Sequence, residues 1–199
     1  MTVIGLIRHG VTDWNVQLRA QGHTDIPLNE AGRQQAGLLA GRIGAEAWDA
    51  VYSSDLGRAF ETARTATAAL GLEVLVDERL REVFLGEIEG TTEEERVNRW
   101  GADWRQRELG EEPRDEAADR GLQAIRDIAD KHPNQRVLIV SHGGLIGCTL
   151  KKMVPEAEFA GFLGNTSVTL VRRNENGGWA CDLYNCTTHL ESKQEREEA

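Results

Sequence analysis

The sequence predicts an α/β protein, a three-layer α/β/α sandwich with a mostly parallel central sheet, one antiparallel edge and a helical lid insertion. Short apolar runs alternate with longer helical patterns as far as residue 153, which is typical of parallel strands joined by helices. After residue 167, two strand-like runs flank a turn rich in Asn and Gly, which indicates an antiparallel hairpin. The 199 residues fit a single domain, expected to span residues 1–199.

The first half of the chain contains three expected strands and two expected helices. Residues 3–7 form a short apolar run, typical of a buried strand. Asn29 can cap a helix that continues to residue 43, and Glu30 suits the positive end of that helix. A second strand over residues 50–53 leads into an Ala- and Thr-rich helix from about 57 to 70, and a third strand follows over 73–76.

The second half is expected to hold the lid and the hairpin. Residues 91–131 are helical in composition with a break near 110–113, and the insertion over about 87–130 is predicted to cover one end of the sheet. The β-branched run 136–140 is the clearest strand, and a helix over 145–153 follows it. Residues 168–171 and 179–184 form the hairpin, and the charged tail 189–199 is expected to fray.

Charge and composition limit the classes of partner. The formal net charge is −10, from 33 acidic and 23 basic side chains, so the surface disfavours nucleic acid and anionic membrane as partners. Any anion-binding site must therefore be built from a few converging cations. Three cysteines without a Cys-x-x-Cys pair argue against a disulfide framework. No signal-like stretch or apolar run of about 20 residues is present, so we expect a cytoplasmic location.

Two predicted strands end in the same His-Gly step. Arg8-His9-Gly10 follows the first strand, and Ser141-His142-Gly143 follows the strand after the lid. Ligands bind outside the carboxyl ends of the strands in open parallel sheets, so both imidazoles should lie on the same rim. The helix that opens after Gly143 would point backbone N–H groups at this rim. Taken alone, the residues leave His9 and His142 as equivalent candidates for a catalytic group.

Arg58 is a third candidate at this rim. It lies in the first turn of the helix that follows the second strand, where the helix dipole disfavours a cation. A bound anion would explain this position. An ion pair with Glu61 or Asp55 on the protein surface would explain it equally well.

Several short motifs, in order from residue 3 to about 170, resemble the histidine phosphatase superfamily, the phosphoglycerate-mutase-like proteins. The resemblance rests on Arg8-His9-Gly10 with Asn15, on the Ser-Ser-x-Leu-x-Arg-Ala-x-x-Thr-Ala run from Ser53, and on Ser141-His142-Gly143-Gly144. The segment from Gly22 to Asn29 and the Leu80-Arg81-Glu82 step are similar to further family motifs. Val11 and Ile88 depart from the family pattern, which bears on substrate preference.

The resemblance implies a metal-independent phosphomonoesterase without a cofactor, acting on small phosphorylated metabolites. His9 would become the phosphohistidine, and Glu82 would protonate the leaving oxygen and then activate water. Glu82 should accordingly be held protonated under apolar cover. The residues implied to bind phosphate or substrate are Arg8, Asn15, Gln21, Gly22, Arg58, His142 and Gly143.

Three alternatives are weighed against this interpretation. A phosphoglycerate mutase needs basic residues for the substrate carboxylate, and only Arg96, Arg99, Arg105 and Arg107 in the insertion offer them. A metal-dependent hydrolase is disfavoured because the five histidines lack ligand spacing such as His-x-x-x-His. A non-catalytic phosphometabolite-binding protein is disfavoured because the core catalytic residues are all present.

Some aromatic and cysteine residues have structural interpretations. Trp100, Trp104 and Phe84 either pack the lid or line the substrate pocket. Cys148 is expected to be a small core residue, and His189 a surface residue. The hairpin near residue 176 is either a sheet edge or an interface, which leaves a homodimer open.

Overall fold

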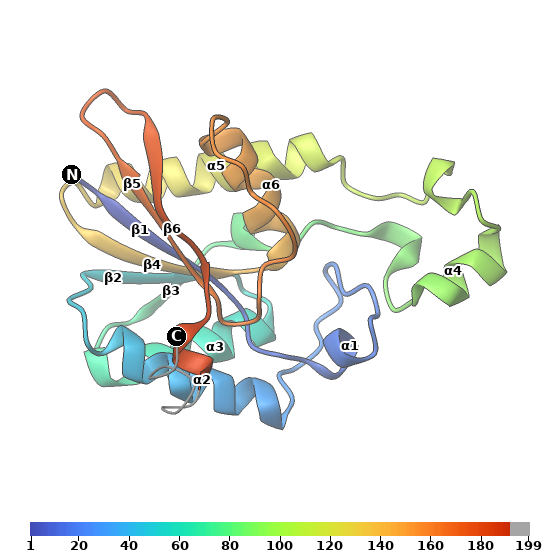
Figure 1. Cartoon of the computed structure of the whole chain (residues 1–199), viewed down its shortest axis with the longest axis horizontal. Helices are drawn as coiled ribbons and strands as arrows, with labels where there is room; N and C mark the ends of the chain where they lie inside the picture. The colour runs from blue at the N-terminus through green and yellow to red at the C-terminus, as the bar shows by residue number, and fades with distance from the viewer. Residues whose placement is uncertain (192–199) are drawn as a thin grey trace.

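The computed structural model describes residues 1–191 and contains a six-stranded sheet in the order β3-β2-β4-β1-β5-β6 (Figure 1). Its strands are β1 (Val3–Arg8), β2 (Ala50–Ser53), β3 (Val74–Val76), β4 (Arg136–Ser141), β5 (Val168–Arg173) and β6 (Trp179–Cys186). β1, β2, β3 and β4 pair in parallel, whereas β5 is antiparallel to both β1 and β6. The predicted fold class, a mostly parallel sheet with an antiparallel edge, is confirmed.

The central strands β1 and β4 bring the two His-Gly steps together. Their register runs from Val3 opposite Arg136 to Arg8 opposite Ser141, so the two strands end side by side. Both strands are apolar and nearly wholly buried, as expected for strands covered on two faces. His9 and His142 are the next residues of each chain segment and therefore emerge at the same rim.

Helices cover both faces of the sheet (Figure 1). α2 (Glu30–Ile43) and α3 (Gly57–Thr67) bury Leu39, Ala59 and Ala63 against one face, and α3 continues as a 3-10 turn over Ala68–Leu70. α5 (Arg114–Lys131) and α6 (Gly143–Met153) form the other layer. The predicted cap at Asn29 is present, because its side chain accepts the Gly32 N–H at 2.9 Å.

Short elements connect these layers. α1 (Asp13–Val16) was not predicted, because four residues show no hydrophobic periodicity, yet Thr12 and Asn15 form a capping box around it. The remaining short pieces are 3-10 turns at Glu78–Leu80, Gly86–Ile88, Trp104–Gln106 and Thr188–Leu190.

The predicted lid over 87–130 is wrong in its second half. Residues 86–113, here called the arm, project from the sheet with α4 (Glu93–Trp100) at the far end (Figure 1). Ile88, Trp104 and Leu109 are buried together inside the arm and give it a small core of its own. Residues 114–131 instead form α5, which buries its alanine-rich face against the body, with Ala117 and Ala124 fully covered.

The predicted frayed tail is wrong at its start. Thr188–Leu190 form a 3-10 turn, and the His189 side chain is only 8% exposed, hydrogen bonded through Nε2 to Thr166 Oγ1 at 3.0 Å. His189 is therefore not a surface residue. Residues 192–199 of the predicted tail lie outside the described part of the chain. Among residues 1–191, no helix has the length and apolar character that crossing a membrane requires.

Candidate active site

A cavity of about 640 Å³ opens at the carboxyl ends of the parallel strands. His9 lines it and is 2% exposed, while His142 lies directly behind it, fully buried, with the ring centroids 5.2 Å apart. Of the residues predicted from sequence, the cavity brings together Arg8, His9, Asn15, Gln21, Gly22, Arg58, Glu82 and Gly143. His142 contacts this group but contributes no lining surface.

A hydrogen bond fixes the tautomer of His9. Nδ1 lies 2.7 Å from the Gly10 carbonyl oxygen, which can only accept, so Nδ1 carries the proton and Nε2 holds the lone pair. Burial, followed by the charges of Arg58 and Arg8, holds the pKa of His9 well below its usual value of 6.5. His9 is therefore a neutral imidazole at neutral pH, with a basic nitrogen available to a ligand.

His142 is held by a serine that the sequence analysis overlooked. Its Nε2 lies 2.9 Å from the Ser54 hydroxyl, which follows β2 on the same rim. Burial, together with Arg58, His9 and Arg8, lowers the pKa of His142 well below 6.5. Nδ1 of His142 is buried and has no hydrogen-bond partner among the described residues.

Arg8, which is half-buried, and Arg58 place two cations beside these imidazoles. Arg58 is fully buried and donates to the Thr24 and Gly22 carbonyls at 2.9 and 2.8 Å, and Arg8 donates to the Leu163 carbonyl. In residues 1–191 neither guanidinium has a carboxylate within 4.0 Å. Burial lowers the pKa of both side chains, so a bound anion would relieve their desolvation and mutual repulsion.

The ion-pair explanation for Arg58 is excluded. Glu61 pairs with Arg33 at 2.8 Å, and Asp55 accepts from Arg81 at 2.8 Å. The position of Arg58 in the first turn of α3 is therefore explained by the cavity rather than by a surface pair.

Asn15 and Gln21 present amide nitrogens to the cavity. The Thr12 N–H donates to Asn15 Oδ1 at 3.1 Å, and the Thr12 hydroxyl donates to Gln21 Oε1 at 3.0 Å, which fixes both amides with their oxygens turned to Thr12. Asn165, which was not predicted, donates to the His9 carbonyl at 2.9 Å and to Asn15 Oδ1 at 3.3 Å. The loop before β5 thus supports the His9 backbone.

Two glycines at the start of α6 allow close approach. A Cβ on Gly143 would lie 3.1 Å from Arg8 Nε, and a Cβ on Gly144 would lie 2.6 Å from Glu82 Oε1. The Gly-Gly step therefore admits both the arginine and the acid to the helix N-terminus.

Glu82 is held by backbone donors. Its Oε1 accepts the N–H groups of Val83 at 2.9 Å and Leu145 at 2.7 Å, and its Oε2 accepts the Gly144 N–H at 3.0 Å. The three contacts fix the carboxyl group at the N-terminus of α6. Backbone N–H groups surround its oxygens where apolar cover was predicted from sequence, and the predicted protonated state stays a prediction.

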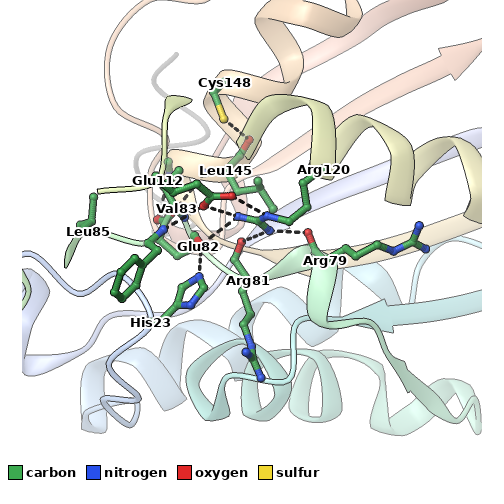
Figure 2. A network of polar contacts seen from close by, with 12 residues as sticks. His23, Arg79, Arg81, Glu82, Val83, Leu85, Glu112, Arg120, Leu145 and Cys148 are labelled. Carbon is green, nitrogen blue, oxygen red and sulfur yellow. Dashed lines mark hydrogen bonds and ion pairs between the residues drawn. The ribbon is translucent and has the colours of Figure 1, made fainter. Parts of the chain in front are cut away.

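The backbone around Glu82 is fixed by a polar network (Figure 2). Arg120 of α5 donates to the carbonyls of Arg79, Arg81 and Glu82 at 2.7, 3.0 and 3.2 Å. Glu112 accepts from Arg120 at 2.8 Å, and His23 Nε2 lies 2.7 Å from the Glu82 carbonyl, to which it donates. The acid is therefore attached to α5 as well as to α6.

The cavity lining differs from the prediction for the aromatic and cysteine residues. Trp100, Trp104 and Phe84 do not line the cavity; Trp104 is buried in the arm, and Phe84 lies against His23. Cys148, expected in the core, is half-buried and lines the cavity. The lining residues that were not predicted are Arg19, Leu85, Arg114, Gly144, Gly147, Cys148, Lys151, Phe159, Gly161, Phe162, Leu163 and Tyr184.

Fold and site together define a class of protein: an α/β sandwich with a cationic, histidine-containing pocket at the carboxyl ends of its parallel strands. Within residues 1–191, no three His, Cys, Asp or Glu side chains are grouped to hold a metal ion. The sequence model of the histidine phosphatase superfamily (branch 1) matches residues 4–187. The chain belongs to this family.

Similar proteins carry both phosphatase and mutase names. Phosphoglycerate mutase-like protein 4 of Arabidopsis thaliana is 39% identical and covers 94% of this chain, with 86% of that protein matched. The metal-independent phosphoserine phosphatase of Arabidopsis thaliana is 36% identical, covering 96% of this chain and 84% of its own. The structure of Bacillus stearothermophilus YhfR superposes with a TM-score of 0.87 at 32% identity, covering 96% of this chain and 100% of its own.

Proposed function

We propose that the protein is a metal-independent phosphomonoesterase that hydrolyses small phosphorylated metabolites through a phosphohistidine on His9. The observation that carries this proposal is the neutral His9, whose Nδ1–H is bound to the Gly10 carbonyl and whose Nε2 is left for the cavity. Beside it, Arg8 and Arg58 have no carboxylate partner among residues 1–191. A neutral imidazole is a good nucleophile toward phosphorus and a good leaving group once phosphorylated.

In the first step, Nε2 of His9 attacks phosphorus and the P–O bond to the alcohol breaks. Arg8 and Arg58 hold the non-bridging oxygens, with Asn15 and Gln21 as neutral donors. His142 is fully buried and supports the ring of His9, with the two ring centroids 5.2 Å apart. Glu82 gives the departing alkoxide a proton. The second step returns this proton to Glu82, so the cycle closes without a net change at the carboxyl group.

In the second step, Glu82 takes a proton from water as the water oxygen attacks the phosphohistidine. The P–N bond breaks, His9 returns to its neutral tautomer and inorganic phosphate leaves. The carboxylate that the first step leaves is the base for this step, and three backbone N–H groups hold its oxygens in place.

The arm supports a phosphatase over a mutase. Arg96 and Arg105 stack on Trp104 at 4.9 and 4.4 Å, and both pair with Glu93. Arg99 stacks on Trp100 at 4.5 Å, and Arg107 lies 3.9 Å from Asp103. None of these four arginines lines the cavity, so none is placed to hold a phosphoglycerate carboxylate. The similarity to phosphoglycerate mutase-like proteins keeps the mutase as the second candidate.

Product analysis in excess EDTA tests the proposal. Phosphoserine and 3-phosphoglycerate are tested in parallel as substrates. Phosphoserine is included because a relative that is 36% identical is named a phosphoserine phosphatase. A phosphatase releases inorganic phosphate at a rate that EDTA leaves unchanged. Formation of 2-phosphoglycerate without phosphate release would show a mutase, and loss of activity in EDTA would contradict the metal-independent mechanism.

A further inference from the structure

A second pair of cations lines the cavity away from the two histidines. Arg114 begins α5, and Lys151 lies in the last turn of α6. Cavity-lining residues include five Arg or Lys side chains but only one carboxylate, Glu82, in a chain whose net charge is −10. The cavity lining is therefore positively charged, although the whole chain carries a net negative charge.

Arg114 and Lys151 are unpaired in the part of the chain that the structure describes. Neither has a carboxylate within 4.0 Å, whereas the adjacent Lys152 contacts Asp115 at 2.8 Å and Asp119 at 2.7 Å. Arg114 also occupies the first position of a helix, where the dipole disfavours a cation. Both side chains are exposed at the cavity, where a ligand anion would pair with them without displacing a protein carboxylate.

One face of α6 connects the two cationic regions. Gly143, Gly144, Gly147, Cys148 and Lys151 line the cavity along it. A Cβ on Gly147 would meet nothing within 4 Å, so packing does not require this glycine, although glycine inside a helix costs about 1 kcal/mol relative to alanine. The aromatic residues that line the cavity are Phe159, Phe162 and Tyr184, and Phe162 is 98% exposed.

The spacing sets the length of the ligand. Arg8 lies close to the first turn of α6, where a Cβ added to Gly143 would come 3.1 Å from its Nε. Lys151 lies about two helical turns further, roughly 12 Å along the axis. Side chains lean toward the N-terminus of a helix, so the ammonium group reaches back along the groove. The space between is lined by small and aromatic residues and suits an apolar or ring-bearing spacer.

We propose that this groove is a subsite for a second anionic group, so that the preferred substrate is a phosphomonoester with a carboxylate or second phosphate beyond an apolar spacer. Arg114 and Lys151 hold that group, and Gly147 leaves room for the spacer. This inference rests on the proposed function for the placement of the reacting phosphate on Arg8 and Arg58.

Calorimetric binding of non-hydrolysable phosphonates tests the subsite without turnover. Hexylphosphonate and 6-phosphonohexanoate differ only in the terminal carboxylate, and phosphonoacetate is too short to reach Lys151. The native protein should bind 6-phosphonohexanoate about tenfold more tightly than hexylphosphonate. Hexane-1,6-diyldiphosphonate, compared with the carboxylate compound, shows which anionic group the subsite prefers.

Variants locate the effect. Lys151→Gln and Arg114→Gln should each reduce the advantage of the terminal carboxylate while leaving hexylphosphonate and phosphonoacetate binding unchanged. Lys152→Gln is the matched control and should keep the full advantage. Equal affinity for the two long phosphonates in the native protein, or an advantage that survives both substitutions, would overturn the subsite. Failure of hexylphosphonate itself to bind would instead contradict the proposed phosphate site.

Discussion

At the scale of single residues, one hydrogen bond distinguishes His9 from His142. His9 Nδ1 donates to the Gly10 carbonyl, which leaves Nε2 as the basic nitrogen facing the cavity. His142 uses Nε2 for Ser54 and is fully covered behind His9. The residues alone left these two histidines equivalent, and the neighbouring contacts give them different positions and different chemistry.

Glu82 gives a prediction at this scale. Glu82→Gln cannot deliver a proton to the leaving oxygen, so alkyl esters, whose alkoxides are poor leaving groups, should lose about 10²–10³-fold in kcat/KM. An ester with an acidic leaving group, such as p-nitrophenyl phosphate, should lose far less. The comparison uses kcat/KM because this constant reports the phosphorylation step and excludes the later attack of water. Equal losses for both esters would rule out the proton-donor role.

At the scale of elements, the segment before Glu82 is attached to α5 by Arg120. Its guanidinium donates hydrogen bonds to the backbone carbonyls of Arg79, Arg81 and Glu82 (Figure 2). The carboxylate of Glu112 accepts from the same guanidinium. A loop residue that acts in catalysis needs such support, because it lacks the regular hydrogen bonds of a helix or strand. Arg120 is therefore a positioning residue for Glu82.

Arg120→Met should keep the bulk of the side chain and remove its donors. We expect about a tenfold loss in kcat/KM for alkyl esters, with a smaller loss for p-nitrophenyl phosphate, because the misplaced group is Glu82. Arg120→Lys should restore part of the activity. Arg126→Met, on the same helix and exposed, is the control. An equal loss in kcat/KM for alkyl esters and p-nitrophenyl phosphate would indicate that the substitution destabilises the protein and does not act through the position of Glu82.

Some secondary-structure elements could be predicted from the sequence, and others could not. β1 and β4 were predictable because a short, wholly apolar run has few interpretations, and their parallel pairing places His9 and His142 on the same rim. The part of the cavity wall formed by Phe159 and Phe162 was not predictable, since no periodicity marks the loop before β5. Tyr184 lies in the predicted strand β6, but its place on the cavity depends on how that loop folds against it. Trp104 could not be assigned from sequence, because its burial depends on how the arm folds on itself.

At the scale of the whole molecule, three buried histidines link stability to pH. Burial lowers the pKa of His9 and His142 well below 6.5, and burial with the charge of Arg42 lowers the pKa of His189 to about 4. In the unfolded chain each should titrate near 6.5. Between 6.5 and the folded-state pKa values, the unfolded state binds more protons, so stability falls as pH falls below 6.5.

The expected slope is up to about 1.4 kcal/mol per pH unit for each histidine. Urea unfolding between pH 6.5 and 5 measures it in a range where most carboxylates remain ionised in both states. His189→Gln, which keeps a polar partner for Thr166, should remove about one third of the slope. A free energy of unfolding that is independent of pH in this range would contradict the buried, neutral histidines.

Rapid chemical quench with ³²P-labelled substrate in EDTA tests whether His9 becomes phosphorylated during turnover. The native protein, His9→Ala and His142→Ala are compared. We expect an acid-labile, alkali-stable phosphoenzyme in the native protein, none in His9→Ala, and a phosphoenzyme that still forms, though more slowly, in His142→Ala. Measurable turnover in the native protein without any labelled enzyme, or labelling that persists in His9→Ala, would contradict the assignment of His9 as the nucleophile.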